Sequence, residues 1–303
     1  MVGLLTRLRV HVSWWEILRR TFREAFFTDN CLGMAAQLSY YFFFALFPAL
    51  LVLIAIASYS PVERLIDDLI ATMGGIAPSE VLIIITDQLR KISEGEQGGL
   101  LTIGMLTALW SSSAAMTAIS DTLNRAYGVE ETRPWWRVRL QAIALTVGLS
   151  VFILISGALV IIGPSLAEGL ANRLDLGPVF EWSWKILQWP VIFMLVAATV
   201  TIVYYFAPDV RQEWVWLTPG SILTTVVWLA ASLGFKFYIA SLASYTETYG
   251  AIGGVMVLML WFYLSGLILL IGAELNAEIE HASPEGKADG ERVPHRKAMP
   301  RAS

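Results

Sequence analysis

The sequence predicts an all-α, polytopic membrane protein. We expect a bundle of six transmembrane helices, with amphipathic helices at the N-terminus and in the first outward loop. The composition is the first reason: 56% of the 303 residues are hydrophobic and only 15% are charged, whereas soluble domains carry about 25% charged residues. The second reason is that the apolar residues gather in runs of the length that crosses a bilayer as a helix, roughly 20 residues.

Six runs qualify as membrane spans, and together they form a transmembrane domain at 32–280. They cover residues 32–58, 99–120, 140–162, 186–207, 215–240 and 251–273. Tryptophans precede the third run, at Trp135 and Trp136, and open the fifth, at Trp214 and Trp216. Indole rings favour the membrane interface, because one edge of the ring is apolar and the N–H needs water or a headgroup.

The distribution of basic residues predicts the orientation of these spans. With the N-terminus inside, 15 of the 21 Lys and Arg residues fall in inward segments. Short cytoplasmic loops carry such an excess of positive charge. Both termini are therefore predicted to be cytoplasmic.

Three further segments are predicted outside the spans. Residues 1–31 form a cytoplasmic amphipathic segment, which either lies flat in the headgroup region or packs on the bundle. Amphipathic helices in the outward loop, at about 61–93, either cover a cavity mouth or pack on the bilayer surface. Residues 281–303 are small, charged and rich in proline, so we expect a disordered cytoplasmic tail.

The composition also excludes several classes of protein. A formal net charge of −4 argues against a nucleic-acid-binding protein, which would show a basic surface. The single cysteine, Cys31, excludes a disulfide framework and Cys-rich metal sites. We expect no cofactor, no bound metal and no nucleic-acid partner. Membrane lipids are the expected partners, and a homo-oligomer or envelope partner proteins stay open.

Polar residues gather toward the inner ends of three spans. In the second span, Ser113, Thr117, Ser120 and Asn124 recur every three or four residues and so share one helix face. This stripe has two interpretations: structural hydrogen bonds between helices, or a hydrated vestibule or relay at the cytoplasmic end. An Arg125–Glu274 ion pair is one arrangement we considered. The candidate vestibule comprises Gln37, Ser113, Thr117, Ser120, Asp121, Asn124, Arg125, Glu274, Asn276 and Glu278.

Prolines and glycines mark candidate helix kinks. A proline inside a helix removes a backbone hydrogen bond, and broken helices are common where transporters bind or gate. They also occur in inert bundles, where neighbouring helices restore the lost hydrogen bonds. The candidate kinks are Pro48, Pro219, Gly220, Gly250, Gly253 and Gly254.

Three motifs in order carry a family resemblance. They are DNCLGMAAQLSYYFFFALFPAL at 29–50, LWSSSAAMTAISDTLNRAY at 109–127 and TYGAIGGVMVLMLWFYLSGLILLIGAELNAE at 248–278. Over about residues 15–281 the chain resembles the YihY/virulence factor BrkB family, formerly labelled ribonuclease BN. The resemblance implies a multi-pass protein of the bacterial inner (plasma) membrane, with suggestions of lipid or amphiphile export. It provides no catalytic residues.

Two functions fit these observations. The first is a transporter or flippase-like protein for a lipid or other amphiphile in envelope biogenesis. The second is a non-transporting membrane scaffold for envelope assembly. No Walker motif occurs, so the chain itself is not expected to hydrolyse ATP. Ribonuclease activity is not expected either, because the His pair or clustered metal ligands that it needs form no motif here. We therefore expect no enzymatic activity.

Overall fold

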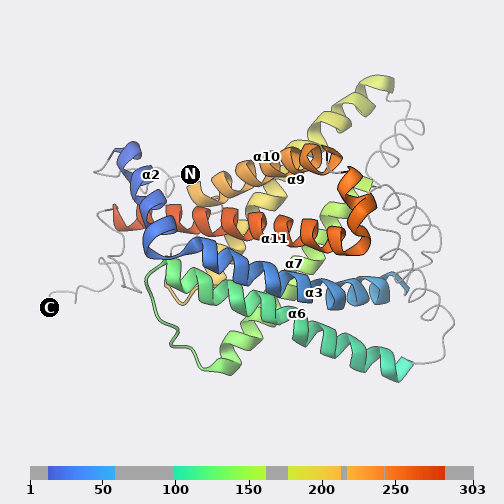
Figure 1. Cartoon of the computed structure of the whole chain (residues 1–303), viewed down its shortest axis with the longest axis horizontal. Helices are drawn as coiled ribbons and strands as arrows, with labels where there is room; N and C mark the ends of the chain where they lie inside the picture. The colour runs from blue at the N-terminus through green and yellow to red at the C-terminus, as the bar shows by residue number, and fades with distance from the viewer. Residues whose placement is uncertain (1–12, 59–97, 162–176, 213–216, 242, 284–303) are drawn as a thin grey trace. The chain divides into compact units, whose positions relative to one another are not determined.

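The computed structural model describes residues 13–58, 98–161, 177–212, 217–241 and 243–283. Within these residues every regular element is a helix and no strand occurs (Figure 1). The all-α prediction is thus confirmed for the described part of the chain. The predicted outward helices, the first 12 residues and nearly all of the predicted tail lie outside it.

The long helices coincide with the predicted spans. In chain order the elements are α2 (Trp14–Arg23), the π-helix η1 (Glu24–Thr28), α3 (Cys31–Ser58), α6 (Gly98–Ala126), α7 (Trp135–Ile161), α9 (Gly177–Phe206), α10 (Pro219–Ser241) and α11 (Ala243–His281). Three segments are long and apolar enough to cross a membrane, namely Ile186–Phe206, Pro219–Ile239 and Gly253–His281. The chain is thus membrane-integral, while the total of six spans stays a prediction.

The amphipathic helix predicted near the N-terminus is present as α2. Its N-cap is Ser13, whose Oγ accepts a hydrogen bond from the Glu16 N–H at 3.3 Å, which satisfies one free donor of the first turn. One side of α2 buries Ile17 against Leu275 and Ile279 of α11. The other side exposes Trp15. The helix therefore packs on α11 with one side and leaves an apolar side chain exposed on the other.

The chain divides into two compact units. One unit consists of residues 1–32, 120–229 and 267–303, and the other of residues 33–119 and 230–266. In the second unit, aromatic side chains pack between helices. The rings of Phe42 and Phe262 are 5.9 Å apart, and those of Phe235 and Trp261 are 5.0 Å apart.

The first unit contains a close approach between α10 and α11, at Gly220 and Gly272. A β-carbon added to Gly220 would overlap the Gly272 carbonyl oxygen and lie 2.6 Å from Cγ of Asn276. One added to Gly272 would overlap Oγ1 of Thr224 and lie 2.5 Å from the Tyr204 hydroxyl. Small residues let helix backbones meet in this way, and only glycine fits at either position.

The predicted kink at Pro219 and Gly220 is wrong. Pro219 is the first residue of α10, where the missing N–H has no helical partner to lose. Proline therefore starts this helix, and Gly220 serves the close packing instead. Elsewhere α3 continues through Pro48, and α11 continues through Gly250, Gly253 and Gly254. Kinks at these positions stay predictions.

We predict that Gly220→Ala lowers the thermal unfolding midpoint of the detergent-solubilised protein. The added methyl group would push α10 away from α11, and overpacking of this kind costs about 1–3 kcal/mol. The matched control is Gly234→Ala, where a β-carbon meets nothing within 4 Å. The control should unfold no earlier than wild type, because alanine favours helix by about 1 kcal/mol over glycine. Equal midpoints for both variants would contradict the close approach.

Candidate functional site

Part of the predicted polar stripe is satisfied within its own helix. The buried Ser113 donates its hydroxyl to the Trp110 carbonyl oxygen at 2.8 Å. Thr117 donates to the Ser113 carbonyl oxygen at 3.0 Å. Both bonds stay inside α6, so these hydroxyls need no partner on another helix. On α3 Gln37 is exposed, and on α6 Ser120 is buried.

The Arg125–Glu274 ion pair that was considered does not form among the described residues. Arg125 instead lies 3.4 Å from Asp121, one turn away on an exposed face of α6. Glu274 is buried, with 2% of its surface exposed. Four residues along a helix bring Asp121 and Arg125 together on one face, and that face is directed to the outside.

Glu274 lies in a small cluster with the buried Cys31 and the half-buried Asp29. The Cys31 thiol donates to Oε1 of Glu274 at 3.7 Å, and the Asp29 side chain also hydrogen-bonds Glu274. Glu278 follows one turn later and lies 4.0 Å from Nδ1 of His281. Among the described residues no basic side chain pairs with Glu274, so this buried carboxyl has acidic and neutral neighbours.

Asn276 has a structural role at the start of α10. Its Oδ1 accepts a hydrogen bond from the Gly220 N–H at 2.8 Å, and its Nδ2 donates to Oγ1 of Thr218 at 3.0 Å. Free N–H groups at a helix start need such acceptors. The amide therefore caps α10 from the neighbouring α11.

Buried hydrogen bonds connect α9, α10 and α11. The Tyr204 hydroxyl donates to the Leu269 carbonyl oxygen at 2.6 Å and lies 2.7 Å from Oγ1 of Thr224. One turn away, Thr201 donates to Oγ of Ser221 at 2.9 Å. The sequence analysis missed these residues, although Tyr204 and Thr201 share one face of an apolar helix at a spacing of three.

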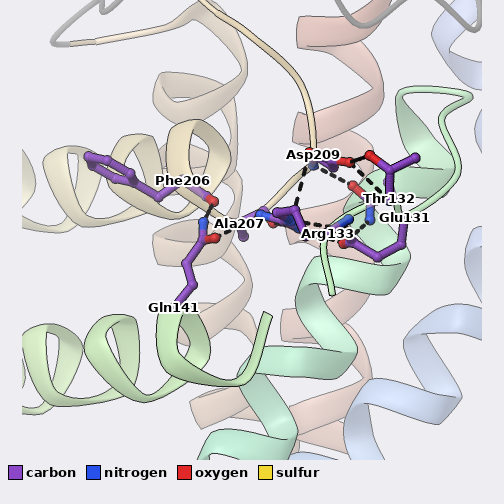
Figure 2. Close-up of polar contacts among 8 residues, drawn as sticks. Glu131, Thr132, Arg133, Gln141, Phe206, Ala207 and Asp209 are labelled. Carbon is purple, nitrogen blue, oxygen red and sulfur yellow. Dashed lines mark hydrogen bonds and ion pairs between the residues drawn. The ribbon is translucent and has the colours of Figure 1, made fainter. Parts of the chain in front are cut away.

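A second set of polar side chains holds the α6–α7 connection against the end of α9. We call it the loop cluster, and it consists of Asn124, Glu131, Thr132, Arg133, Gln141 and Asp209. Figure 2 labels Glu131, Thr132, Arg133, Gln141 and Asp209. The buried Asn124 donates to Oε2 of Glu131 at 2.9 Å and accepts from the Asp209 N–H at 2.6 Å. Of the predicted vestibule, the loop cluster contains only Asn124.

Arg133 is the centre of the loop cluster. It donates to Oε2 of Glu131 at 2.6 Å, to Oε1 of Gln141 at 2.8 Å and to the Ala207 carbonyl oxygen at 2.9 Å. Asp209 lies 3.8 Å from its Nε. Gln141 in turn donates to the Phe206 carbonyl oxygen. Figure 2 shows these groups converging, while the Phe206 ring extends away from them.

The loop cluster shifts the pKa values of its charged members. Burial raises the pKa of Glu131, but the hydrogen bonds from Arg133 and Asn124 outweigh it, so the net pKa lies below its usual range. Hydrogen bonding to Glu131 raises the pKa of Arg133. Each partner thus favours the charged form of the other. The sequence analysis missed this pair because charges in connections normally indicate a solvated surface.

A groove of about 310 Å³ lies between α7 and α9, which pack against each other. Its lining is apolar apart from Gln141 and Thr199, and includes Leu145, Gly148, Phe152 and Ile202. Gln141 is also a member of the loop cluster. The groove thus begins where the loop cluster ends.

Comparison with known proteins decides the family. The model of the Virulence factor BrkB family matches residues 22–296. This chain belongs to the BrkB family. The resemblance found in the three sequence motifs is thereby confirmed, and no solved structure matches the chain.

Relatives that are similar to this BrkB-family chain have two kinds of name. A putative ribonuclease-like protein, YfkH, from Bacillus subtilis is 33% identical over 243 residues, which cover 80% of this chain and 88% of that protein. A UPF0761 membrane protein of Paraburkholderia xenovorans is 30% identical over 183 residues, covering 58% of this chain and 39% of the relative. Another, from Alkalilimnicola ehrlichii, is 28% identical over 285 residues, covering 88% and 58%. The chain therefore spans less than two thirds of these two UPF0761 proteins.

We predict that Glu131→Gln lowers the thermal unfolding midpoint near pH 7 and that this difference shrinks in acid. A carboxyl whose folded pKa lies below its usual value of 4.5 stabilises the fold above that value. The stabilisation is lost as the pH falls through the folded pKa. Unfolding midpoints of both proteins, measured from pH 7 to about pH 3, check this.

Asp121→Asn is the control for this series. Its partner Arg125 is 59% exposed, and exposed ion pairs contribute little. The control should follow wild type at every pH. A Glu131→Gln protein that unfolds like the control at neutral pH would refute the stabilising role of the loop cluster.

Proposed function

We propose that this BrkB-family membrane protein is a transporter of the flippase-like kind, which moves a lipid or other amphiphile in envelope biogenesis. The proposal places it in the bacterial inner membrane with six spans and both termini in the cytoplasm. It acts on membrane lipids and catalyses no covalent chemistry.

The buried Glu274 is the observation that carries the proposal. It lies within the candidate span Gly253–His281 and is 2% exposed. Ionisable side chains inside a membrane are costly, and they commonly mark pathways for substrates or ions. A purely structural carboxylate would be expected to have a basic partner, and among the described residues Glu274 has none. In a transporter, the Glu274 side chain would contact a polar headgroup or bind a coupling proton.

A non-transporting scaffold is the second candidate, and one observation favours it. Several of the predicted vestibule residues, such as Asn124, are engaged in contacts that stabilise the fold. Ser113 and Thr117 bond within α6, and Asn276 caps α10. A scaffold needs only such contacts, but they leave Glu274 unexplained.

The ribonuclease-like part of one relative's name belongs to that relative. We do not extend it to this chain, because RNA hydrolysis needs a catalytic constellation of a kind that the sequence does not contain. Within the described residues, no group of three or more His, Cys, Asp or Glu side chains is arranged to hold a metal ion.

We predict that the purified protein moves headgroup-labelled phospholipid across reconstituted vesicles. A membrane-impermeant quencher added outside should quench more than the outer-leaflet half of the label, and Glu274→Gln should abolish the excess. Glutamine keeps the shape of the side chain and removes its charge and its proton exchange. Asp121→Asn, which changes an exposed carboxylate, should translocate like wild type.

The outcomes separate the two candidates. Excess quenching that persists in Glu274→Gln would sink the role of Glu274 but leave transport standing. No excess quenching by wild type, with and without a proton gradient, would reject the transporter and favour the scaffold. Unfolding midpoints of both variants establish that any loss is not a loss of folding.

A further inference from the structure

We propose that the groove between α7 and α9 binds an acyl chain of an anionic phospholipid, with the headgroup beside Arg137. The inference deepens the proposed function and rests on it, since an amphiphile transporter needs a place for an apolar tail. The observations that carry it are the apolar lining of the groove, the free space at Gly148 and the positive charge at one end.

The lining of the groove suits a hydrocarbon chain. Only two of its side chains, Gln141 and Thr199, carry polar groups, and both are engaged elsewhere. Thr199 donates to the Leu195 carbonyl oxygen of its own helix at 3.0 Å. Gln141 accepts from Arg133 at 2.8 Å and donates to the Phe206 carbonyl oxygen. An occupant therefore meets apolar surface and few free hydrogen-bonding groups.

The α7 side of the groove has free space at Gly148. A β-carbon added there meets nothing within 4 Å, although the residue lines the groove. The volume of about 310 Å³ lies at the lower end of the range for small-molecule sites, about 300–1,000 Å³. α9 contains the candidate span Ile186–Phe206, so the groove lies beside hydrocarbon. Acyl chains are the apolar molecules that surround it.

A positive charge lies one helical turn beyond the polar end of the groove. Arg137 precedes Gln141 by four residues and so shares its face of α7. Arg137 is exposed, and its guanidinium lies 5.1 Å from the centre of the Trp136 ring. Unlike Arg133, it pairs with no carboxylate within the described residues. Tryptophan marks headgroup depth, and anionic lipids attract arginine there.

A helix of a second copy is the rival occupant. Ala144 and Gly148 are four residues apart and both exposed, which is a common helix-contact spacing in membranes. Arg137 favours the lipid, because a phosphate complements its charge at the groove end.

The test uses phosphatidylglycerol and phosphatidylcholine that carry a photoactivatable group on one acyl chain. The full-length protein is placed in lipid nanodiscs, irradiated and digested, and labelled peptides are mapped. We expect phosphatidylglycerol to label the α7 and α9 walls of the groove. Gly148→Phe should lower this labelling about tenfold, because the ring would occupy the free space beside α7. Arg137→Gln should reduce phosphatidylglycerol labelling to the level of phosphatidylcholine.

Matched variants keep the test falsifiable. Gly234→Phe places the same ring at another helical glycine with open space, and Gly148→Ala leaves most of the groove free. Both should label like wild type. Uniform labelling along the chain, or unchanged labelling in Gly148→Phe, would overturn the proposal. Light scattering tests the rival occupant. If the wild-type protein is a dimer without groove labelling, and Gly148→Phe dissociates that dimer, the proposal is overturned in favour of a second copy.

Binding and transport are scored separately in this design. Groove labelling by a wild-type protein that fails to translocate lipid would keep the groove and reject the transporter. Translocation with no groove labelling would keep the transporter and reject the groove.

Discussion

The near contact of two helix backbones, at Gly220 and Gly272, determines how the polar groups around it are satisfied. Because α10 and α11 meet there without intervening side chains, Asn276 of α11 reaches the first N–H groups of α10. The same crossing brings the Tyr204 hydroxyl onto the Leu269 carbonyl oxygen and beside Thr224. In a membrane, buried polar groups must find such partners within the protein. The close approach supplies them, and Glu274, two residues after Gly272, is held beside the crossing.

The loop cluster organises the other side of the same unit. Arg133 and Gln141 both bind carbonyl oxygens at the end of α9, those of Ala207 and Phe206. The start of α7 is thereby fixed against the end of α9. This attachment sets the polar end of the groove between these helices. A structural ion-pair network and a candidate lipid site thus share one residue, Gln141.

The helices were predictable from the sequence, whereas the site was largely not. Long apolar runs leave helix as the only way to satisfy the backbone in a membrane, so α9, α10 and α11 follow from composition. The start of α10 shows the limit: the apolar run begins at 215, but Pro219 is the first helical residue. Proline suits a first turn better than an interior position, and in the folded protein Asn276 of α11 accepts a hydrogen bond from the following N–H, that of Gly220.

Side-chain partners depend on how each helix is rotated, which periodicity does not determine. Ser113 and Thr117 share a face, yet their hydroxyls bond within α6. Asn124 was a candidate vestibule residue, but Asp209, whose N–H it binds, lies 85 residues away in the chain. No spacing rule connects such residues. Glu274 was likewise a candidate vestibule residue, but no pattern in the sequence indicates that its side chain is buried against Cys31.

Contact of Glu274 with a headgroup or a coupling proton, as proposed, requires its buried surroundings to open to water, and Cys31 can report on this directly. It is the single cysteine of the chain, it is 0% exposed, and its thiol contacts Glu274 at 3.7 Å. The measurement is the rate at which a small, water-soluble methanethiosulfonate modifies Cys31 in intact membrane vesicles. If Glu274 takes part in transport, we expect steady modification of the folded protein. A thiol that stays unmodified while the denatured protein reacts completely would contradict it and indicate a static scaffold.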